Sequence, residues 1–265
     1  MNRLPCVLPE PRLIRFMTYN VHRCLGRDGQ YSPQRIADVI ASAEPDIVAL
    51  QELDVGRTRS GGVDQAEIIG ATLGMRAQFF PAMKVMEELY GDAILTACPS
   101  RLVKTGALPS WPLLRWLEPR GALWASVTVA GQEVQIINTH LGLFSQERAN
   151  QIDALLGPEW LGHPECRDPV ILVGDFNAYP RSRTYRKLSR RLHDVQNLCS
   201  DRKRCTFPSR FPALRLDYAF VGPAIQVTRV DTVRTPLARM ASDHLPLVVE
   251  IEIDPALSQV QQAAQ

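Results

Sequence analysis

Short apolar segments that end on polar side chains recur along the chain, and they limit the folds open to it. The segments 14–21 (IRFMTYNV), 46–52 (DIVALQE) and 170–174 (VILVG) are each too brief for a buried helix and are rich in strand-favouring residues. Stretches with helical spacing lie between them, such as 145–156 (SQERANQIDALL). Because buried strands that alternate with amphipathic helices fold as helices packed on a β-sheet, the sequence predicts an α/β (α+β) protein.

The boundaries of several elements can be predicted from capping residues. Ser32 is a good N-cap, Pro33 suits the first helical position, and Glu44-Pro45 stops the helix. The segment between Pro99 and Pro119 has no clean period and is predicted to be a loop. Together the patterns predict helices at 33–43, 63–73, 145–156 and 184–192, and strands at 14–21, 46–52, 93–97, 122–129, 133–139, 170–174, 216–221 and 247–253.

Composition excludes several classes of protein. Of the 265 residues 45% are hydrophobic and 22% are charged, which is typical of a globular chain, and the 20 scattered prolines exclude a coiled coil. No apolar run approaches the roughly 18 residues that cross a bilayer, and MNRLPCVLPEPR lacks the apolar core of a secretion signal, so we expect a cytoplasmic protein.

The six cysteines form no CxxC pair and are predicted to be free thiols. No Gly/Ser-rich linker divides the chain, so we expect one domain at 14–254, an N-terminal extension at 1–13 and a polar tail at 255–265.

The charge of the chain is unevenly distributed. Residues 181–215 hold eleven Lys and Arg against two acids, a net charge of +9, whereas the whole chain carries +2 and the remainder therefore −7. A basic segment on an otherwise acidic protein is typical of a surface that attracts phosphate groups. We therefore expect residues 181–215 to flank the functional site and to contact anionic surfaces, and we expect no obligate protein partner.

Polar residues at the strand ends form the candidate site. Each of them alone is typical of a turn or a helix cap. The recurrence of such residues at several strand ends changes that interpretation. Carboxylates that converge at one edge of the fold repel one another unless a hard cation relieves the repulsion. Oxygen-rich ligands favour Mg²⁺, with Mn²⁺ as a substitute, whereas Zn²⁺ would need more His or Cys. The set comprises Asn20, Glu52, His140, Asp175, Asn177, Asp217, Asp243 and His244.

At this point the sequence resembles a known superfamily. The segments MTYNVH, PDIVALQELD, YGDAIL, PRGAL, NTHL, VGDFNA, RLDYAFV and SDHLPL are similar, in this order, to the motifs of the endonuclease/exonuclease/phosphatase superfamily, and they span about 14–253. The resemblance implies a DNase I-like four-layer α/β/β/α sandwich of two packed mixed β-sheets with helices outside. It also implies a metal-dependent hydrolase of phosphate esters.

The resemblance also implies a role for each motif residue. Asn20, Glu52 and Asp243 would hold the metal, with Glu52 as the principal ligand. Asp175 would orient or deprotonate the attacking water, and Asn177 would hold a phosphate oxygen. His244 would act as a general acid/base or contact the phosphate, oriented by Asp217.

Three further positions follow from the same resemblance. His140 matches the DNase I-like and sphingomyelinase-like branches, whereas abasic-site nucleases have another residue there, so abasic-site repair is disfavoured. Arg120 in PRGAL would bind the scissile phosphate, with a surface ion pair as the alternative. Asp92 in YGDAIL stands where many relatives have Asn and would bind substrate phosphate or metal.

The sequence leaves three functions open. The first is a Mg²⁺-dependent phosphodiesterase or nuclease that uses in-line attack by water, for which the basic segment 181–215 would track a phosphate backbone. The second is a phospholipid or small phosphate-ester hydrolase at a membrane surface, with Trp111, Leu113, Leu114 and Trp116 as interfacial side chains, although a packed loop is the alternative there. The third, a binding protein without catalysis, is disfavoured because every expected catalytic position is filled.

Overall fold

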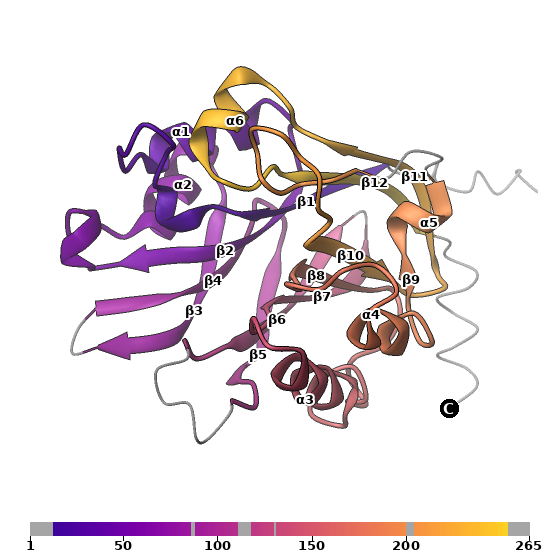
Figure 1. Cartoon of the computed structure of the whole chain (residues 1–265). Helices are drawn as coiled ribbons and strands as arrows, with labels where there is room; N and C mark the ends of the chain where they lie inside the picture. Colours follow the sequence, from indigo (N-terminus) through magenta and orange to yellow (C-terminus); the bar gives the residue numbers. More distant parts are fainter. Residues whose placement is uncertain (1–12, 86–87, 111–117, 130, 200–203, 254–265) are drawn as a thin grey trace, which may run out of the picture.

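Two mixed β-sheets of six strands each form the centre of the protein (Figure 1). The computed structural model describes residues 13–85, 88–110, 118–129, 131–199 and 204–253. In spatial order the first sheet contains β11 (Ile225–Thr232), β12 (Leu247–Ile253), β1 (Ile14–Asn20), β2 (Ile47–Val55), β4 (Glu88–Thr96) and β3 (Arg76–Val85). The second sheet contains β5 (Ser100–Ala107), β6 (Gly121–Val129), β7 (Gln132–His140), β8 (Val170–Asp175), β10 (Asp217–Val221) and β9 (His193–Asp194).

Helices cover the outer face of each sheet (Figure 1). The first sheet carries α1 (Pro33–Ala41), α2 (Gln65–Leu73) and α6 (Pro236–Ala241), and the second carries α3 (Ser145–Leu156) and α4 (Arg183–Leu188). The short helix α5 (Val195–Cys199) packs against β9, β10 and β11. Two 3₁₀ turns, His22–Cys24 and Thr58–Ser60, follow β1 and β2. No helix among the described residues is long and apolar enough to cross a bilayer.

Three hydrophobic clusters hold these layers together, and strand alternation explains them. In β1, Phe16 faces the opposite sheet while its neighbour Met17 faces the helices, because successive side chains of a strand point to opposite faces. The central cluster joins Phe16 to residues of the second sheet such as Leu123, and the outer clusters join each sheet to its helices. The predicted four-layer α/β/β/α sandwich is confirmed.

The strand directions bring the polar residues to one edge of the sandwich. Strands β1 and β2 are parallel, as are β7 and β8, so Asn20 lies beside Gln51 and His140 lies beside Asp175. Strand β10 is antiparallel to β8 and begins where β8 ends, which places Asp217 directly opposite Asp175. The sequence analysis predicted that polar residues follow their strands, but Asp217 starts its strand and reaches the same edge through the reversed direction.

The structure also corrects the predicted elements. The segment predicted to be a loop between Pro99 and Pro119 contains β5, and β3 and β11 were not predicted at all. All three are edge strands with one unpaired side and few buried residues, so they lack the apolar run by which the inner strands were recognised.

The proposed interfacial residues Trp111, Leu113, Leu114 and Trp116 lie outside the described residues, as do 1–12 and 254–265 at the two termini. The five described cysteines carry free thiols, as predicted, and Cys6 lies outside the described residues.

Candidate active site

Glu52 reaches the site through a break in the regular strand. A β-bulge in β2 between Leu50 and Leu53 places Glu52 in a left-handed conformation, with φ of 64°. A bulge re-aims the side chain it carries, so Glu52 turns toward the site. The Asn20 amide donates hydrogen bonds to Glu52 Oε1 at 2.9 Å and to Asp175 Oδ2 at 3.1 Å, while its oxygen accepts from the His22 backbone N–H at 3.0 Å. Asn20 therefore links Glu52 of the first sheet to Asp175 of the second sheet by hydrogen bonds.

A buried amide of the opposite sheet stabilises this bulge. Asn138 of β7 donates to the carbonyl oxygens of Leu50 at 2.8 Å and Ala93 at 2.9 Å, which lie on the two strands that the bulge disturbs. The Asn138 oxygen accepts from Gln51 Nε2 at 2.7 Å, and both side chains are fully buried. The Asn of the NTHL motif thus links the sheets directly behind Glu52.

Asp175 occupies the floor of the site at the end of β8. The preceding Gly174 has φ of 142°, and a Cβ there would lie 1.7 Å from the Thr139 carbonyl oxygen, so only glycine fits between the paired strands. Asp175 Oδ1 accepts from the Asn177 backbone N–H at 2.9 Å, and Oδ2 lies 3.6 Å from His140 Nε2 and 3.7 Å from His244 Nε2. Burial raises the pKa of Asp175 to about 7, although the His244 charge opposes that shift.

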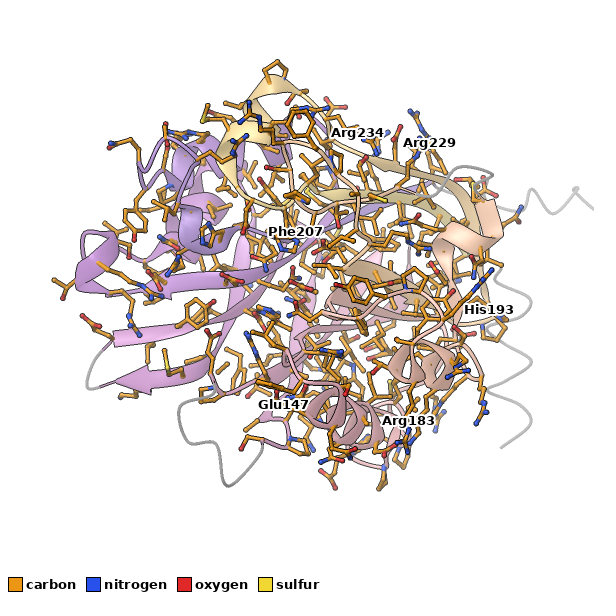
Figure 2. The ribbon with its side chains drawn as sticks, viewed as in Figure 1. Glu147, Arg183, His193, Phe207, Arg229 and Arg234 are labelled. Carbon is orange, nitrogen blue, oxygen red and sulfur yellow. The ribbon has the colours of Figure 1, made fainter. Side chains whose placement is uncertain are left out.

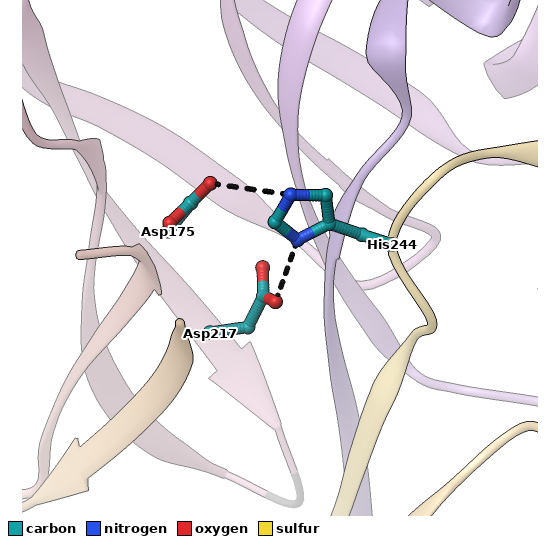
Figure 3. Close-up of side chains that lie close together, drawn as sticks. All are labelled: Asp175, Asp217 and His244. Carbon is teal, nitrogen blue, oxygen red and sulfur yellow. Dashed lines mark hydrogen bonds and ion pairs between the residues drawn. The ribbon is translucent and has the colours of Figure 1, made fainter. Parts of the chain in front are cut away.

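His244 lies between two carboxylates (Figure 3). Its Nδ1 is 2.8 Å from Asp217 Oδ2, an oxygen that also accepts from the Thr206 hydroxyl at 2.5 Å. Burial lowers the pKa of His244, but the charges of Asp217 and Asp175 outweigh that effect and raise it to about 10. The imidazole is therefore protonated at neutral pH, and Asp217 orients it as the sequence analysis predicted.

His140 differs from His244 because its neighbour is a cation. Arg120 Nη1 lies 2.9 Å from His140 Nδ1 and 2.7 Å from Glu118 Oε1. Burial lowers the pKa of His140 well below its usual value, and the charges of Arg120 and His244 lower it further. A guanidinium group only donates hydrogen bonds, so Nδ1 accepts from Arg120. The other ring nitrogen, Nε2, lies 3.1 Å from the Asn177 amide nitrogen and 3.6 Å from Asp175 Oδ2. Arg120 is thus a buried member of an ion pair that lines the pocket, and its predicted contact with the scissile phosphate stays a prediction.

Asp92 lies behind Glu52 in the buried part of β4. Its carboxyl accepts from the Glu52 backbone N–H, and its Oδ2 has no hydrogen-bond partner among the described residues. Burial raises the pKa of Asp92 to about 8, while Arg120 opposes that shift. Asp92 does not line the pocket, so it acts on the backbone that carries Glu52, and its predicted contact with substrate stays a prediction.

An open pocket of about 320 Å³ collects these side chains. Of the predicted site residues, it is lined by Glu52, Arg120, His140, Asp175, Asn177, Asp243 and His244, with Asn20, Asp92 and Asp217 buried behind them. The pocket is also lined by residues that the sequence analysis did not select, among them His22, Arg23, Arg59, Met83, Tyr90 and Glu118. His22, Tyr90 and Glu118 lie in or beside the quoted motifs, whereas no sequence signal distinguishes Arg59 from other surface arginines.

The donor set of this pocket fits a hard divalent cation. One ligand atom from each of Asp175, Asp217 and His244 lies within 4.8 Å of the others, so this buried group could hold a metal. Since His244 is protonated and bonded to Asp217, the carboxylates that face the pocket are the better ligands, namely Glu52, Asp175 and the half-exposed Asp243. These are oxygen donors, as Mg²⁺ and Mn²⁺ prefer.

Among its described residues, the basic segment 181–215 contributes none to the pocket lining. Several of its cations have partners elsewhere: Lys187 pairs with Asp153, and Arg215 is buried against Asp194 at 2.7 Å. Figure 2 shows Arg183 on the outer helix α4, away from Phe207 near the middle of the molecule. The segment reaches the site through uncharged residues instead, because the Phe207 ring packs 4.8 Å from the His244 ring and Thr206 bonds to Asp217. The described cations of the segment thus do not line the pocket, and the expectation that its positive charge flanks the site stays a prediction.

The fold and site together define the class of protein. Two packed mixed sheets with outer helices, and a carboxylate and imidazole cluster at one edge, form the DNase I-like architecture that the motifs predicted. Residues 17–244 match the sequence model of the Endonuclease/Exonuclease/phosphatase family, and the chain belongs to this family. Members of the family are phosphoesterases, which supports a hydrolase of phosphate esters.

Comparisons with individual proteins agree with this assignment. The chain is 24% identical over 250 residues to YbhP of Escherichia coli (strain K12), covering 90% of this chain and 96% of YbhP. Its structure is similar to that of an endonuclease/exonuclease/phosphatase family protein from Bacteroides thetaiotaomicron, with a TM-score of 0.74, 24% identity and coverage of 92% and 99% of the two chains. It is also similar to the mannosyl-6-phosphatase Bt3783 of that species, with a TM-score of 0.72, 24% identity and coverage of 90% and 99%.

Proposed function

We propose that this protein is a Mg²⁺-dependent phosphodiesterase that hydrolyses its substrate by in-line attack of water. The observation that carries the proposal is the arrangement around Asp175, whose Oδ2 lies 3.6 and 3.7 Å from two imidazoles in opposite protonation states. A carboxylate with a pKa of about 7 is suited to take a proton from water at neutral pH. The protonated His244 beside it is suited to give one up or to stabilise negative charge.

In this proposal each pocket side chain has its own role at the scissile phosphate. Asp175 orients and deprotonates the attacking water, and His140 and Asn177, which line the pocket beside it, hold phosphate oxygens. His244, whose proton Asp217 secures, stabilises the charge that develops in the transition state. A divalent cation bound at Glu52 and Asp243 would neutralise charge on the phosphate oxygens.

The charge of the pocket favours a diester over a monoester. Four carboxylates, those of Glu52, Glu118, Asp175 and Asp243, line the pocket, and the Arg120 guanidinium is already paired with Glu118 at 2.7 Å. A monoester dianion would meet more repulsion there than the single charge of a diester, because like charges near one another are costly when partly desolvated.

A phospholipid headgroup is the second candidate. Leu143 lines the pocket and is 66% exposed, and the neighbouring Phe144 is 40% exposed. Apolar side chains at the rim of a phosphoesterase site would suit contact with a lipid surface.

The proposal is tested by an activity panel at fixed Mg²⁺ with wild type, Glu52→Gln and His244→Ala. The panel contains bis-p-nitrophenyl phosphate, p-nitrophenyl phosphate, single- and double-stranded DNA, RNA and phospholipid vesicles. We expect the diester to be cleaved faster than the monoester, EDTA to abolish activity, and both variants to lose at least about 100-fold in kcat while remaining folded. Full turnover by either variant would refute the assignment, and cleavage of vesicles with inert oligonucleotides would favour the lipid substrate.

A further inference from the structure

One wall of the pocket carries two arginines and a histidine, and the histidine, His22, adjoins the proposed metal ligand Asp243, with 3.9 Å between His22 Nδ1 and Asp243 Oδ1. This wall is formed by His22 and Arg23, from the 3₁₀ turn after β1, and by Arg59, from the 3₁₀ turn after β2. None of the three is required by the reaction proposed above. We define these three residues as the arginine wall.

The turn that carries His22 and Arg23 is held in an unusual backbone conformation. His22, Arg23 and Cys24 have φ of 46°, 57° and 56°, so three consecutive residues with side chains occupy the left-handed region. Such residues cost free energy and persist only where the surrounding structure holds them. Here the Asn20 side chain binds the His22 N–H, and Gln65 Nε2 donates to the Arg23 carbonyl at 2.7 Å.

A buried chain of hydrogen bonds connects this turn to Arg59. The fully buried Gln65 accepts from the Asp54 backbone N–H at 2.9 Å through its side-chain oxygen. The Asp54 carboxylate, also fully buried, accepts two hydrogen bonds from Arg59, at 2.9 Å from Nε and 2.7 Å from Nη2. The Arg59 guanidinium also lies 5.4 Å from the centre of the Tyr90 ring. One buried network therefore fixes the Arg59 guanidinium and the backbone of Arg23 before any ligand binds.

Arg23 is the cation of this wall that lacks a countercharge. It forms no ion pair within 4.0 Å with the residues that the structure describes, and its buried Nε has no hydrogen-bond partner among them. Its Nη2 lies 2.8 Å from His22 Nε2. Since a guanidinium only donates, His22 Nε2 accepts this hydrogen bond. The Arg23 guanidinium, which has no ion-pair partner among the described residues, offers donors and positive potential that suit an anion.

We propose that the arginine wall is a second anion subsite, which binds a phosphate group that the substrate carries beside the scissile one. This inference rests on the proposed function, because it names the class of phosphodiester that the same pocket prefers. The acidic centre receives the scissile diester, and the arginine wall receives the additional phosphate. Fixed guanidinium groups suit phosphate because their planar donors match its oxygens.

The test compares substrate pairs that differ by one phosphate. For a nucleotide source we compare thymidine 5′-(p-nitrophenyl phosphate) with its 3′-phosphorylated form, and for a lipid-headgroup source glycerophosphoinositol with glycerophosphoinositol 4-phosphate. We expect wild type to prefer the phosphorylated member of at least one pair by about tenfold in kcat/KM, the effect of one charge-assisted contact. The pair that shows the preference identifies the source.

Three variants assign the preference to the wall. Arg23→Ala should abolish the preference and change kcat/KM for the substrate without the extra phosphate by less than about twofold. Arg59→Lys, which keeps a charge beside the buried Asp54, should reduce the preference. Arg27→Ala, an exposed arginine nearby that does not line the pocket, is the matched control and should leave it unchanged.

Binding to the metal-free protein separates this inference from the proposed function. In EDTA, isothermal titration should show that wild type binds pyrophosphate about tenfold more tightly than inorganic phosphate, and that Arg23→Ala does not. If no ester is cleaved but this difference persists, the proposed function fails and the subsite stands. If esters are cleaved without any preference, or Arg23→Ala weakens both members of a pair equally, the subsite is refuted and the proposed function stands.

Discussion

Replacing Asn138 with alanine should both destabilise the protein and displace Glu52. The substitution leaves the buried carbonyl oxygens of Leu50 and Ala93 without the amide that now binds them at 2.8 and 2.9 Å. An unsatisfied buried polar group costs about 1–3 kcal/mol, so we expect the loss at the two carbonyl oxygens to lower the free energy of unfolding by about 2–6 kcal/mol. Gln51 Nε2 loses one acceptor but keeps Thr18 Oγ1 at 3.1 Å, so it adds little to this cost.

Urea unfolding of the metal-free protein measures the stability, and kcat with bis-p-nitrophenyl phosphate measures the position of Glu52. A shift of the bulge by about 1 Å should lower kcat by about 100-fold, because catalysis is sensitive to misplacement on that scale. Asn150→Ala, at an exposed position on α3, is the control and should change the unfolding free energy by less than about 0.5 kcal/mol. If Asn138→Ala unfolds at the wild-type urea concentration and retains wild-type kcat, the link between this amide and Glu52 is refuted.

Two further predictions concern pH. Asp217→Asn removes the carboxylate that holds the pKa of His244 near 10, so kcat of the variant should fall as pH rises above about 7 where wild type does not; superimposable pH profiles would contradict this role. In the metal-free protein, burial raises the pKa of Asp175 to about 7 and that of Asp92 to about 8, above their values in the unfolded chain, so their ionisation opposes folding as pH rises toward those values. His244, whose folded pKa is also raised, loses its stabilising contribution as pH rises through about 10. The thermal midpoint in EDTA should therefore be lower at pH 9 than at pH 6, and added Mg²⁺ should narrow the difference.

Much of the inner framework could be predicted from the sequence. The central strands bury both faces, so their residues form continuous apolar runs, as in Val170–Asp175. The edge strands β3, β5 and β11 bury fewer side chains, and their mixed composition gave no such signal. The residues that gather at the pocket could be selected because their motifs are short and local, with each residue fixed relative to the strand beside it.

The position of the basic residues relative to the site was harder to predict than that of the motif residues. Because residues 181–215 follow the GDFN motif directly, proximity in sequence suggested proximity in space. The chain instead leaves the site after β8 and passes to the outer face of the second sheet, where Lys187 and Arg215 bind acids of the surrounding structure. The cations that line the pocket, Arg23 and Arg59, come from turns of the first sheet.

The sequence by itself indicated an α/β fold and the chemistry of the site, since strand periodicity and residue type are local properties. It placed carboxylates, amides and imidazoles at the strand ends, and the resemblance of its motifs implied the two packed sheets. Only the tertiary structure decided the protonation of the two histidines, because both side chains are buried but their charged neighbours differ. Asp217 keeps His244 protonated, while Arg120 helps keep His140 neutral. Those neighbours lie 27 and 20 residues away in the chain. Packing of the two sheets brings Asp217 to His244, and the pairing of β6 with β7 brings Arg120 to His140.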